Sequence, residues 1–448
     1  MEKLIENFDH IYADTRSKTQ QIDPEWLSNI RETSYENLKK IGFPNPKDEL
    51  WKYTSTRDLL GQDFLSPSET FNLEDDIQLD ELPILNLKDS IKIVILNGRF
   101  SGEYSDLSNL PKGCNLICFP EDASSTYFEI ANDHEDQTRY HHPMSFTLLN
   151  NMLFPEIIRL TVDKNTKVKH PIELCFVHQA DSSQSHCYTS SPRLDLIMGE
   201  KSHCQMIENH TTIGESQALI NMHAQISVKR KATLERYIYQ NCNEKSFVFM
   251  HDHAEIDQKA YYTEFAFNRG GKTVRDETFT KFIGKKSDCH VGAVALLHND
   301  QHVDSTVYLD HAMQKCSSRQ VFKNVLKDKS ESVFQGKIHV TPNAQQTDGY
   351  QIHKALLLSD DAIANSKPEL EIYADDVKCS HGSTTGFLRD EDLFYLKSRG
   401  ICQKEAEKLL VIAFIQDALD EIKEDSIKEA FEILMLETFK NGEQQDAE

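Results

Sequence analysis

Long apolar segments are missing from this sequence of 448 residues. No run approaches the roughly 18 consecutive apolar residues of a membrane-spanning helix. The first residues, Met1–Asn7, carry no apolar signal core. Apolar residues still make up 39% of the chain, which is enough to build a large core. We therefore predict a cytoplasmic, globular protein that has no membrane partner.

Signatures of catalytic sites are also scarce. The chain has no Gly-x-Ser-x-Gly elbow, no dinucleotide fingerprint and no His-Glu-x-x-His. Gly271-Lys272-Thr273 has the form of a phosphate-loop ending, but Ala266 stands where such a loop needs another glycine. We therefore predict no catalytic residues and expect that the protein is not an enzyme.

Closed metal sites are not indicated either. The sequence has no Cys-x-x-Cys pair and no four-ligand zinc pattern, and its ten cysteines are scattered. In a cytoplasmic protein these cysteines are expected to be reduced thiols, many of them in the core. Any metal chemistry must therefore use ligands that folding brings together, or ligands shared with another chain.

Basic residues are outnumbered: 49 lysines and arginines face 72 aspartates and glutamates, for a formal net charge of -23. Such a charge repels nucleic acid and anionic membranes and favours basic partners or cations. We predict no nucleic-acid partner. The acidic charge is explained equally well if it serves solubility alone.

Residues 1–88 have a helical pattern. Asp23 and Pro24 are suited to the N-cap and first position of a helix, and Gly42 to its end. Apolar residues recur at helical spacing between them: Leu27, Ile30, Leu38 and Ile41. Trp51 follows, and we expect it to pack this region onto a larger body.

Residues 89–382 consist of many short strand-like runs. Examples are Ile91–Leu96, Ile157–Val162, Leu194–Met198 and Tyr261–Phe267. No convincing amphipathic helix separates them, so the pattern predicts a mainly β core. A barrel, a propeller or a β-solenoid would each accommodate so many strands. Because no sequence repeat of fixed period is visible, patterning does not choose among the three.

Residues 383–448 return to helix. Asp390 can cap a short helix that ends at Gly400, and Ser426-x-x-Glu429 has the form of a capping box for the last helix. Between these two helices, apolar residues predict one stripe on a second helix: Leu409, Ile412, Leu419 and Ile422.

One segment, Leu370–Gly382, combines an apolar run with metal-binding residue types. Read as one extended strand, it places Glu371, Asp375, Cys379 and His381 on one face. A thiolate and an imidazole suit soft or borderline metals, including iron in clusters. Two ligands are too few for a closed site, so Cys379 and His381 would form half of an open one. The plainer reading, a buried cysteine and a hydrogen-bonded histidine near a strand end, stays open.

Several long segments resemble the SufB/SufD family of iron–sulfur cluster assembly proteins. Leu370–Gly382 is very similar to the family signature, and Gly42–Thr54 resembles its SufD branch. Further similar segments lie in the second half of the chain: Phe334–Ile338, Ala344–Gln351, Leu356–Ser359 and Leu393–Ile401. The resemblance is dense from about residue 300 to 415.

The resemblance implies an architecture and a set of partners. The family core is a right-handed parallel β-helix with helical regions at both ends. A SufD-type chain assembles with a SufB-like chain and a SufC-like ABC ATPase, usually one SufB, one SufD and two SufC. The family signature puts Cys379 and His381 near the junction with SufB, where a nascent cluster is thought to assemble. A reduced flavin accompanies the complex in some systems, and the resemblance does not place it on this chain.

The resemblance also implies a docking region for the ATPase on the C-terminal helices. In this sequence that region includes Leu393, Phe394, Leu396, Arg399 and Gly400. The expected function is a non-enzymatic scaffold subunit that helps to build and transfer a cluster. Two alternatives remain: a SufB-like sister subunit, or a carbohydrate-active β-helix enzyme. A homodimer is possible when the chain is isolated.

Overall fold

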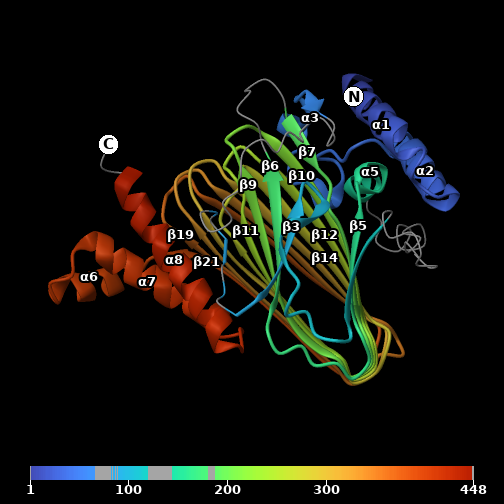
Figure 1. Ribbon diagram of the computed structural model, residues 1–448. Coiled ribbons are helices and arrows are strands. Elements are labelled where there is room, and N and C mark those ends of the chain that lie inside the picture. The colour runs from blue at the N-terminus through green and yellow to red at the C-terminus, as the bar shows by residue number, and fades with distance from the viewer. Residues whose placement is uncertain are drawn as a thin grey trace.

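The core of the computed structural model is a β-solenoid of about seven turns, formed by two facing sheets (Figure 1). The structure describes residues 2–65, 82, 84, 85, 87, 89–119, 144–179 and 187–445. The parallel β-helix with helices at both ends that the family resemblance predicted is confirmed. Part of the predicted 1–88 helical region, including Lys88 at its boundary, lies outside the described residues.

The first sheet runs from one end of the solenoid to the other. Its strands, in spatial order, are β20 (Ile363–Ile372), β18 (Glu331–Val340), β16 (His302–His311), β14 (Thr273–Phe282), β12 (Phe247–Ile256), β10 (Ala218–Val228), β8 (Arg193–Met198), β5 (Ile157–Val162) and β4 (Cys114–Phe119). β7 (Cys187–Ser190) pairs with β10 and with β1 (Phe64–Leu65) at one side.

The second sheet faces the first and is made of the alternate strands. They are β21 (Val377–Phe387), β19 (Thr347–Leu357), β17 (Ser317–Leu326), β15 (Asp288–Leu297), β13 (Tyr261–Asn268), β11 (Thr233–Asn241), β9 (His203–Ile213), β6 (Ile172–Gln179), β2 (Ile91–Leu96) and β3 (Arg99–Asp106). Among the described strands, the pairs β2–β3 and β4–β5 are antiparallel and the others are parallel.

Both faces of most strands are buried, and this weakens the alternation of polar and apolar residues in the sequence. Inward residues of the two sheets form one long apolar core, including Ile226, Tyr262 and Phe334. On the outside, helices cover parts of both sheets (Figure 1). The strand-like runs predicted from the sequence coincide with β2, β5, β8 and β13 to within a residue at each end.

The N-terminal helices cover part of the outer face of the first sheet (Figure 1). They are α1 (Glu2–Thr19), α2 (Glu25–Ile41), the 3-10 turn η1 (Glu49–Trp51), α3 (Arg57–Leu60) and α5 (Ser145–Leu153). Gly42 ends α2 with a φ of 70°, as predicted. The predicted cap is wrong: Pro24 occupies the N-cap position, and the carboxylate of Asp23 accepts a hydrogen bond from Arg31 at 2.7 Å.

Trp51 anchors the N-terminal region on the solenoid, as expected from the sequence. Its side chain is fully buried, stacked on Phe146, and its ring centroid lies 3.9 Å from the guanidinium carbon of Arg275. The same guanidinium donates a hydrogen bond to the backbone oxygen of Leu50 at 3.0 Å. Further along, Glu49 forms an ion pair with Lys367 of β20 at 2.7 Å.

The C-terminal helices are α6 (Asp390–Ser398), α7 (Gln403–Leu419) and α8 (Asp425–Gln445). α7 and α8 pack against the outer face of the second sheet (Figure 1) through Val411, Ile415 and Phe431. The predicted stripe is partly wrong, because Leu409 is exposed while Val411 and Ile415 are buried. The predicted capping box is also displaced: α8 begins at Asp425, so Ser426 lies inside its first turn. None of the described helices is long and apolar enough to cross a membrane.

Candidate cluster site at the open end of the solenoid

The solenoid ends in two strands that each have only one neighbour among the described strands. β20 pairs with β18, and β21 pairs with β19. The other edge of each terminal strand therefore presents backbone N–H and C=O groups without a strand partner, and such edges readily accept a further chain. We call this surface, formed by β20, β21 and the corner between them, the open end.

Cys379 points into the last turn of the solenoid. It packs with Val377 against the apolar side chains of Ile338, Val340 and Ala344. Its register partner on β19 is Gly349, and a Cβ placed at Gly349 would lie 3.4 Å from the Cys379 Sγ. Burial raises the pKa of the Cys379 thiol above its ordinary value. The thiol is therefore protonated near neutral pH, and a metal must displace that proton to bind.

His381 occupies the next inward position of β21 and is exposed. Its register partner is Gln351, whose side-chain amide donates across the interior to the backbone oxygen of Gly336 at 3.1 Å. Ser383, two residues further along β21, also points inward, because it forms a hydrogen bond with Ser366 of β20 at 2.9 Å. Cys379 and His381 thus share one face of one strand, and the histidine lies where no further turn covers it.

The expected single strand over Leu370–Gly382 is divided in the structure. β20 ends at Ile372, a corner follows, and β21 begins at Val377. Glu371 faces outward on β20, where it pairs with Lys337 at 2.6 Å and accepts a hydrogen bond from Tyr373 at 2.7 Å. Glu371 and Asp375 therefore do not share a strand face with Cys379 and His381, because alternation does not continue through a corner.

The thiol and the imidazole do not make a complete metal site. Within the part of the chain that the structure describes, no three His, Cys, Asp or Glu side chains gather to hold a metal ion. Cluster ligation usually takes four protein ligands. A metal or cluster bound to these two side chains would need further ligands, from a second chain or from the cargo itself.

Exposed apolar side chains surround the open end, and they were not predicted from the sequence. Ile372 is 37% exposed, Tyr373 58% and Phe387 56%. Phe387 pairs in register with Leu357, whose side chain packs on the solenoid core. Such residues would be buried if another turn of strand followed. The sequence itself carries no signal of this exposure, because apolar residues at a strand end look the same whether or not a further strand covers them.

Helix α6 stands apart from the core, and none of its side chains is buried. Of the residues expected to dock the ATPase, Phe394 is 74% exposed and Arg399 and Gly400 are exposed, while Leu393 and Leu396 are half-buried. Tyr395 is also exposed, with the Arg399 guanidinium 5.4 Å from its ring centroid. Tyr395 was not among the docking residues that the family resemblance implied.

A charged cluster lies inside the solenoid, remote from the open end. Arg236 of β11 donates to Glu208 at 2.5 Å, to Glu264 at 2.9 Å, and across the interior to Asp252. Burial, with the neighbouring carboxylate of Glu264, raises the pKa of Asp252 to about 7. Burial opposes ionisation of Glu208 as well, but the charge of Arg236 and its hydrogen bonds to this carboxylate lower the pKa of Glu208 to about 2. Two of the carboxyl groups that this guanidinium contacts, those of Asp252 and Glu208, thus have pKa values that are shifted in opposite directions.

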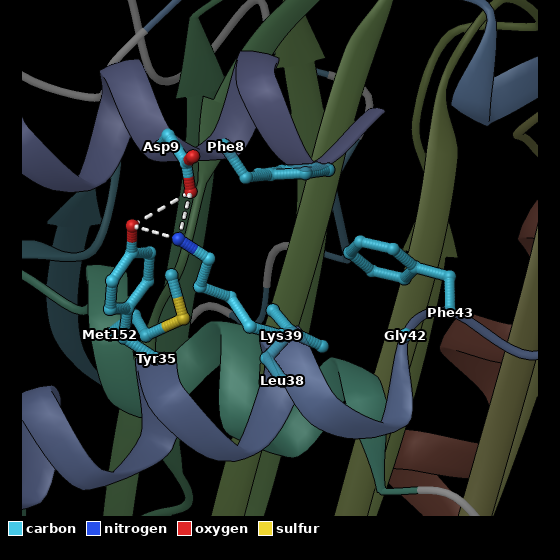
Figure 2. A pocket seen from close by; sticks show the side chains of 8 residues that line it. All are labelled: Phe8, Asp9, Tyr35, Leu38, Lys39, Gly42, Phe43 and Met152. Carbon is cyan, nitrogen blue, oxygen red and sulfur yellow. Dashed lines mark hydrogen bonds and ion pairs between the residues drawn. The ribbon is translucent and has the colours of Figure 1, made fainter. Parts of the chain in front are cut away.

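A small recess lies between α1, α2 and α5 (Figure 2). At its mouth, Tyr35 donates to Asp9 at 2.8 Å, and Lys39 donates to Tyr35 at 3.0 Å. Phe8 and Phe43 line the apolar side. The cavity of about 20 Å³ has room for about one water molecule, so a flavin does not fit it.

Fold and site together define a parallel β-solenoid protein with an open terminal turn that carries a thiol and an imidazole. The chain belongs to the SufBD family: the model of the SufBD core domain of SUF-system iron–sulfur cluster assembly matches residues 178–414, and that of the SufBD N-terminal region matches residues 2–174. It is a SufD-like iron–sulfur cluster assembly protein.

Three of the curated relatives are similar to this chain over most of their own lengths. The iron–sulfur cluster assembly protein SufD of Escherichia coli is 28% identical over 88% of this chain and 89% of its own. A SufBD family protein of Synechocystis is 26% identical over 88% of this chain and 87% of its own. SufD of Bacillus subtilis is 22% identical over 94% and 95%.

Proposed function

We propose that this chain is a non-enzymatic scaffold subunit of the SUF system, which pairs with a SufB-like chain and a SufC-like ABC ATPase to build and transfer a nascent iron–sulfur cluster. The proposal depends most on one observation: among the described strands, β20 and β21 each have one unpaired edge, and inward apolar side chains at this end are exposed. A second solenoid that continued the two sheets would satisfy those backbone groups and cover those side chains.

In this proposal Cys379 and His381 are candidate ligands of a cluster or iron shared between the two solenoids. The inward thiol and the exposed imidazole lie on the same face of β21. Joining the open ends would bring ligands of the SufB-like chain towards them. An incomplete site of this kind binds its cargo weakly, which suits a scaffold that must release the cluster to an acceptor.

The ATPase would dock on α6. Phe394 and Tyr395 lie on the exposed side of this helix, and aromatic residues of this kind often provide most of the energy at interfaces. Leu393, Leu396, Arg399 and Gly400 would complete the surface. Hydrolysis of ATP would then occur on the partner, and the assembly would work in the cytoplasm.

Co-expression with the SufB-like and SufC-like chains of the same genome tests this function. A tag on this chain should recover both partners, and the native mass should correspond to one SufB-like, one SufD-type and two SufC-like chains. The isolated chain could form a homodimer through its open end, which the SufB-like chain should then displace. Recovery of neither partner by an intact, folded chain would contradict the proposal.

A further inference from the structure

A column of lysines follows one edge of the solenoid and stops two turns before the corner of the open end, which lies on the same edge. At this edge each strand of the first sheet turns into the next strand of the second sheet. In five consecutive turns the same corner position is lysine: Lys201, Lys231, Lys259, Lys286 and Lys315. All five side chains are exposed. We call this column the lysine ladder.

The backbone keeps the ladder regular. The N–H of each lysine donates to a carbonyl of the next turn: Lys231 to Gln258 at 2.9 Å, Lys259 to Lys285 at 3.1 Å and Lys286 to Gln314 at 3.1 Å. Successive lysines are therefore one strand spacing apart, about 4.8 Å. The ladder is therefore a regular row of backbone positions, each of which carries an exposed lysine.

Backbone geometry does not explain why these residues are lysine. Each has a φ between 56° and 63°, in the left-handed region that glycine, asparagine and aspartate adopt more readily. At the opposite edge of the solenoid, the corner residue also has a positive φ in several turns. There the residues are Gly214, Gly271, Asn299 and Asp328. Lysine is therefore not the residue type that this backbone conformation favours, although the opposite edge has the favoured types. This indicates that the charged side chains of the ladder have a function of their own.

The ladder concentrates positive charge on an acidic protein. Lys229, Arg230 and Lys285 lie in the same turns and add to it, against a net charge of -23 for the chain. Glu200 neutralises one end, where it pairs with Arg230 at 2.5 Å and Lys201 at 3.4 Å. The ion pairs found among the described residues leave the ladder lysines from Lys231 to Lys315 unpaired.

We propose that the lysine ladder docks an acidic helix of a partner protein. Residues three or four apart on a helix repeat along one face about every 5 Å, which matches the spacing of the ladder. A nucleic acid or an anionic bilayer would extend beyond this row and face the rest of the protein, whose net charge of -23 repels it. A helix that carries carboxylates on one face presents its charge only along the row.

Binding of designed helical peptides to the full-length protein tests the ladder. One probe is a labelled helix-forming peptide, long enough to span the ladder, with glutamates on a single face. A second peptide of the same composition spreads the glutamates around the helix. The single-face peptide should bind at least about fivefold more tightly, and its affinity should fall as salt rises.

The variant Lys231→Asn/Lys259→Asn/Lys286→Asn/Lys315→Asn removes the charge with a residue that accepts the left-handed conformation, so its melting temperature should not fall. It should lose at least about tenfold in affinity for the single-face peptide. A control variant with the same net charge, Lys47→Asn/Lys245→Asn/Lys327→Asn/Lys329→Asn, alters exposed lysines elsewhere and should lose less than about twofold.

Three results would overturn the proposal. The first is equal loss of affinity in the two variants, which would mean that net charge alone acts. The second is equal binding of the two peptides. The third is tighter binding of a single-stranded oligonucleotide or of phosphatidylserine vesicles than of the single-face peptide, which would assign the ladder to another class of partner.

Discussion

Cys379 lies directly beside Gly349, its register partner on the neighbouring strand, with its thiol turned into the apolar end of the solenoid. Burial raises the pKa of this thiol. Cys402, in contrast, is exposed at the start of α7, and the other eight cysteines are buried. The two accessible thiols of the chain therefore differ in environment.

This difference predicts the order of alkylation. At pH 7.5 iodoacetamide should modify Cys402 at least about fivefold faster than Cys379, because the thiolate is the reactive form and Cys379 is only partly accessible. Peptide mass spectrometry over a time course measures both rates in one sample. Formation of the complex with a SufB-like chain should slow Cys379 further. Faster modification of Cys379 than of Cys402 in the isolated chain would contradict the inward placement of the thiol.

The candidate ligands can be tested without disturbing the fold. The variant Cys379→Ser/His381→Ala should keep a melting temperature within about 3 °C of the native protein, because His381 is exposed and Cys379 only half-buried. Cluster formation on the complex, measured as bound iron and acid-labile sulfide, should fall by more than about half.

The matched control, Lys378→Ala/Ser380→Ala, changes the alternate positions of the same strand, which face outward. It should form the cluster normally. Normal iron and sulfide content in the Cys379→Ser/His381→Ala complex would remove both residues from the site.

Helix α6 offers a test of ATPase docking by point substitution. Deleting residues 390–448 would also strip α7 and α8 from the second sheet and expose its apolar face. Phe394→Ser changes only an exposed side chain, and it should weaken binding of the SufC-like chain by at least about tenfold with no change in melting temperature.

The control for this prediction is Ile433→Ser on α8, which removes another exposed apolar side chain. Calorimetric titration of the SufC-like chain into each variant gives the affinities. If Ile433→Ser weakens binding and Phe394→Ser does not, the docking surface lies on α8 and not on α6.

The buried cluster around Arg236 predicts a specific dependence of stability on pH. The folded state raises the pKa of Asp252 from 3.8 to about 7. Between pH 3.8 and about 7, Asp252 has lost its proton in the unfolded chain but keeps it in the folded chain. This carboxyl therefore makes folding less favourable as pH rises. Asp252→Asn removes the titration. Relative to the native protein, its free energy of unfolding should therefore increase by about 2–4 kcal/mol from pH 4 to pH 8.

Urea unfolding of both proteins at several pH values measures this difference. Thr278→Val serves as a control, because it alters a buried neighbour that donates to Glu264 but does not titrate. A constant difference between Asp252→Asn and the native protein across the pH range would show that Asp252 keeps an ordinary pKa.

Much of the fold could be predicted from the sequence, but its architecture could not be predicted from pattern alone. The runs Ile91–Leu96 and Ile157–Val162 are strands as expected, since β-branched residues favour them. The repeat was missed because its length varies: corner residues are 27 apart between Lys259 and Lys286 but 31 apart between Lys315 and Gln346. The β-solenoid was predicted from the resemblance to the family, because the periodicity of the sequence did not distinguish it from a barrel or a propeller.

The site was only partly predictable for a similar reason. Cys379 and His381 share a strand face because they are two residues apart on β21. Glu371 was misplaced because a corner after Ile372 interrupts the alternation, and no glycine or proline marks that corner in the sequence. Tyr373 and Phe387 could not be identified as exposed until the structure showed that, among the described strands, none follows β21 in the solenoid.

The most direct test of the account asks whether the open end joins a SufB-like chain. Phe387→Lys places a charge on the inward face of the last strand, where it would oppose continuation of the sheet. Thr384→Lys, three residues earlier and facing outward, is the control. After co-expression, native mass spectrometry should show that Phe387→Lys retains the SufC-like chain but loses the SufB-like chain, while Thr384→Lys retains both. A full complex with Phe387→Lys, at native yield, would contradict the claim that the solenoid end is the joining surface.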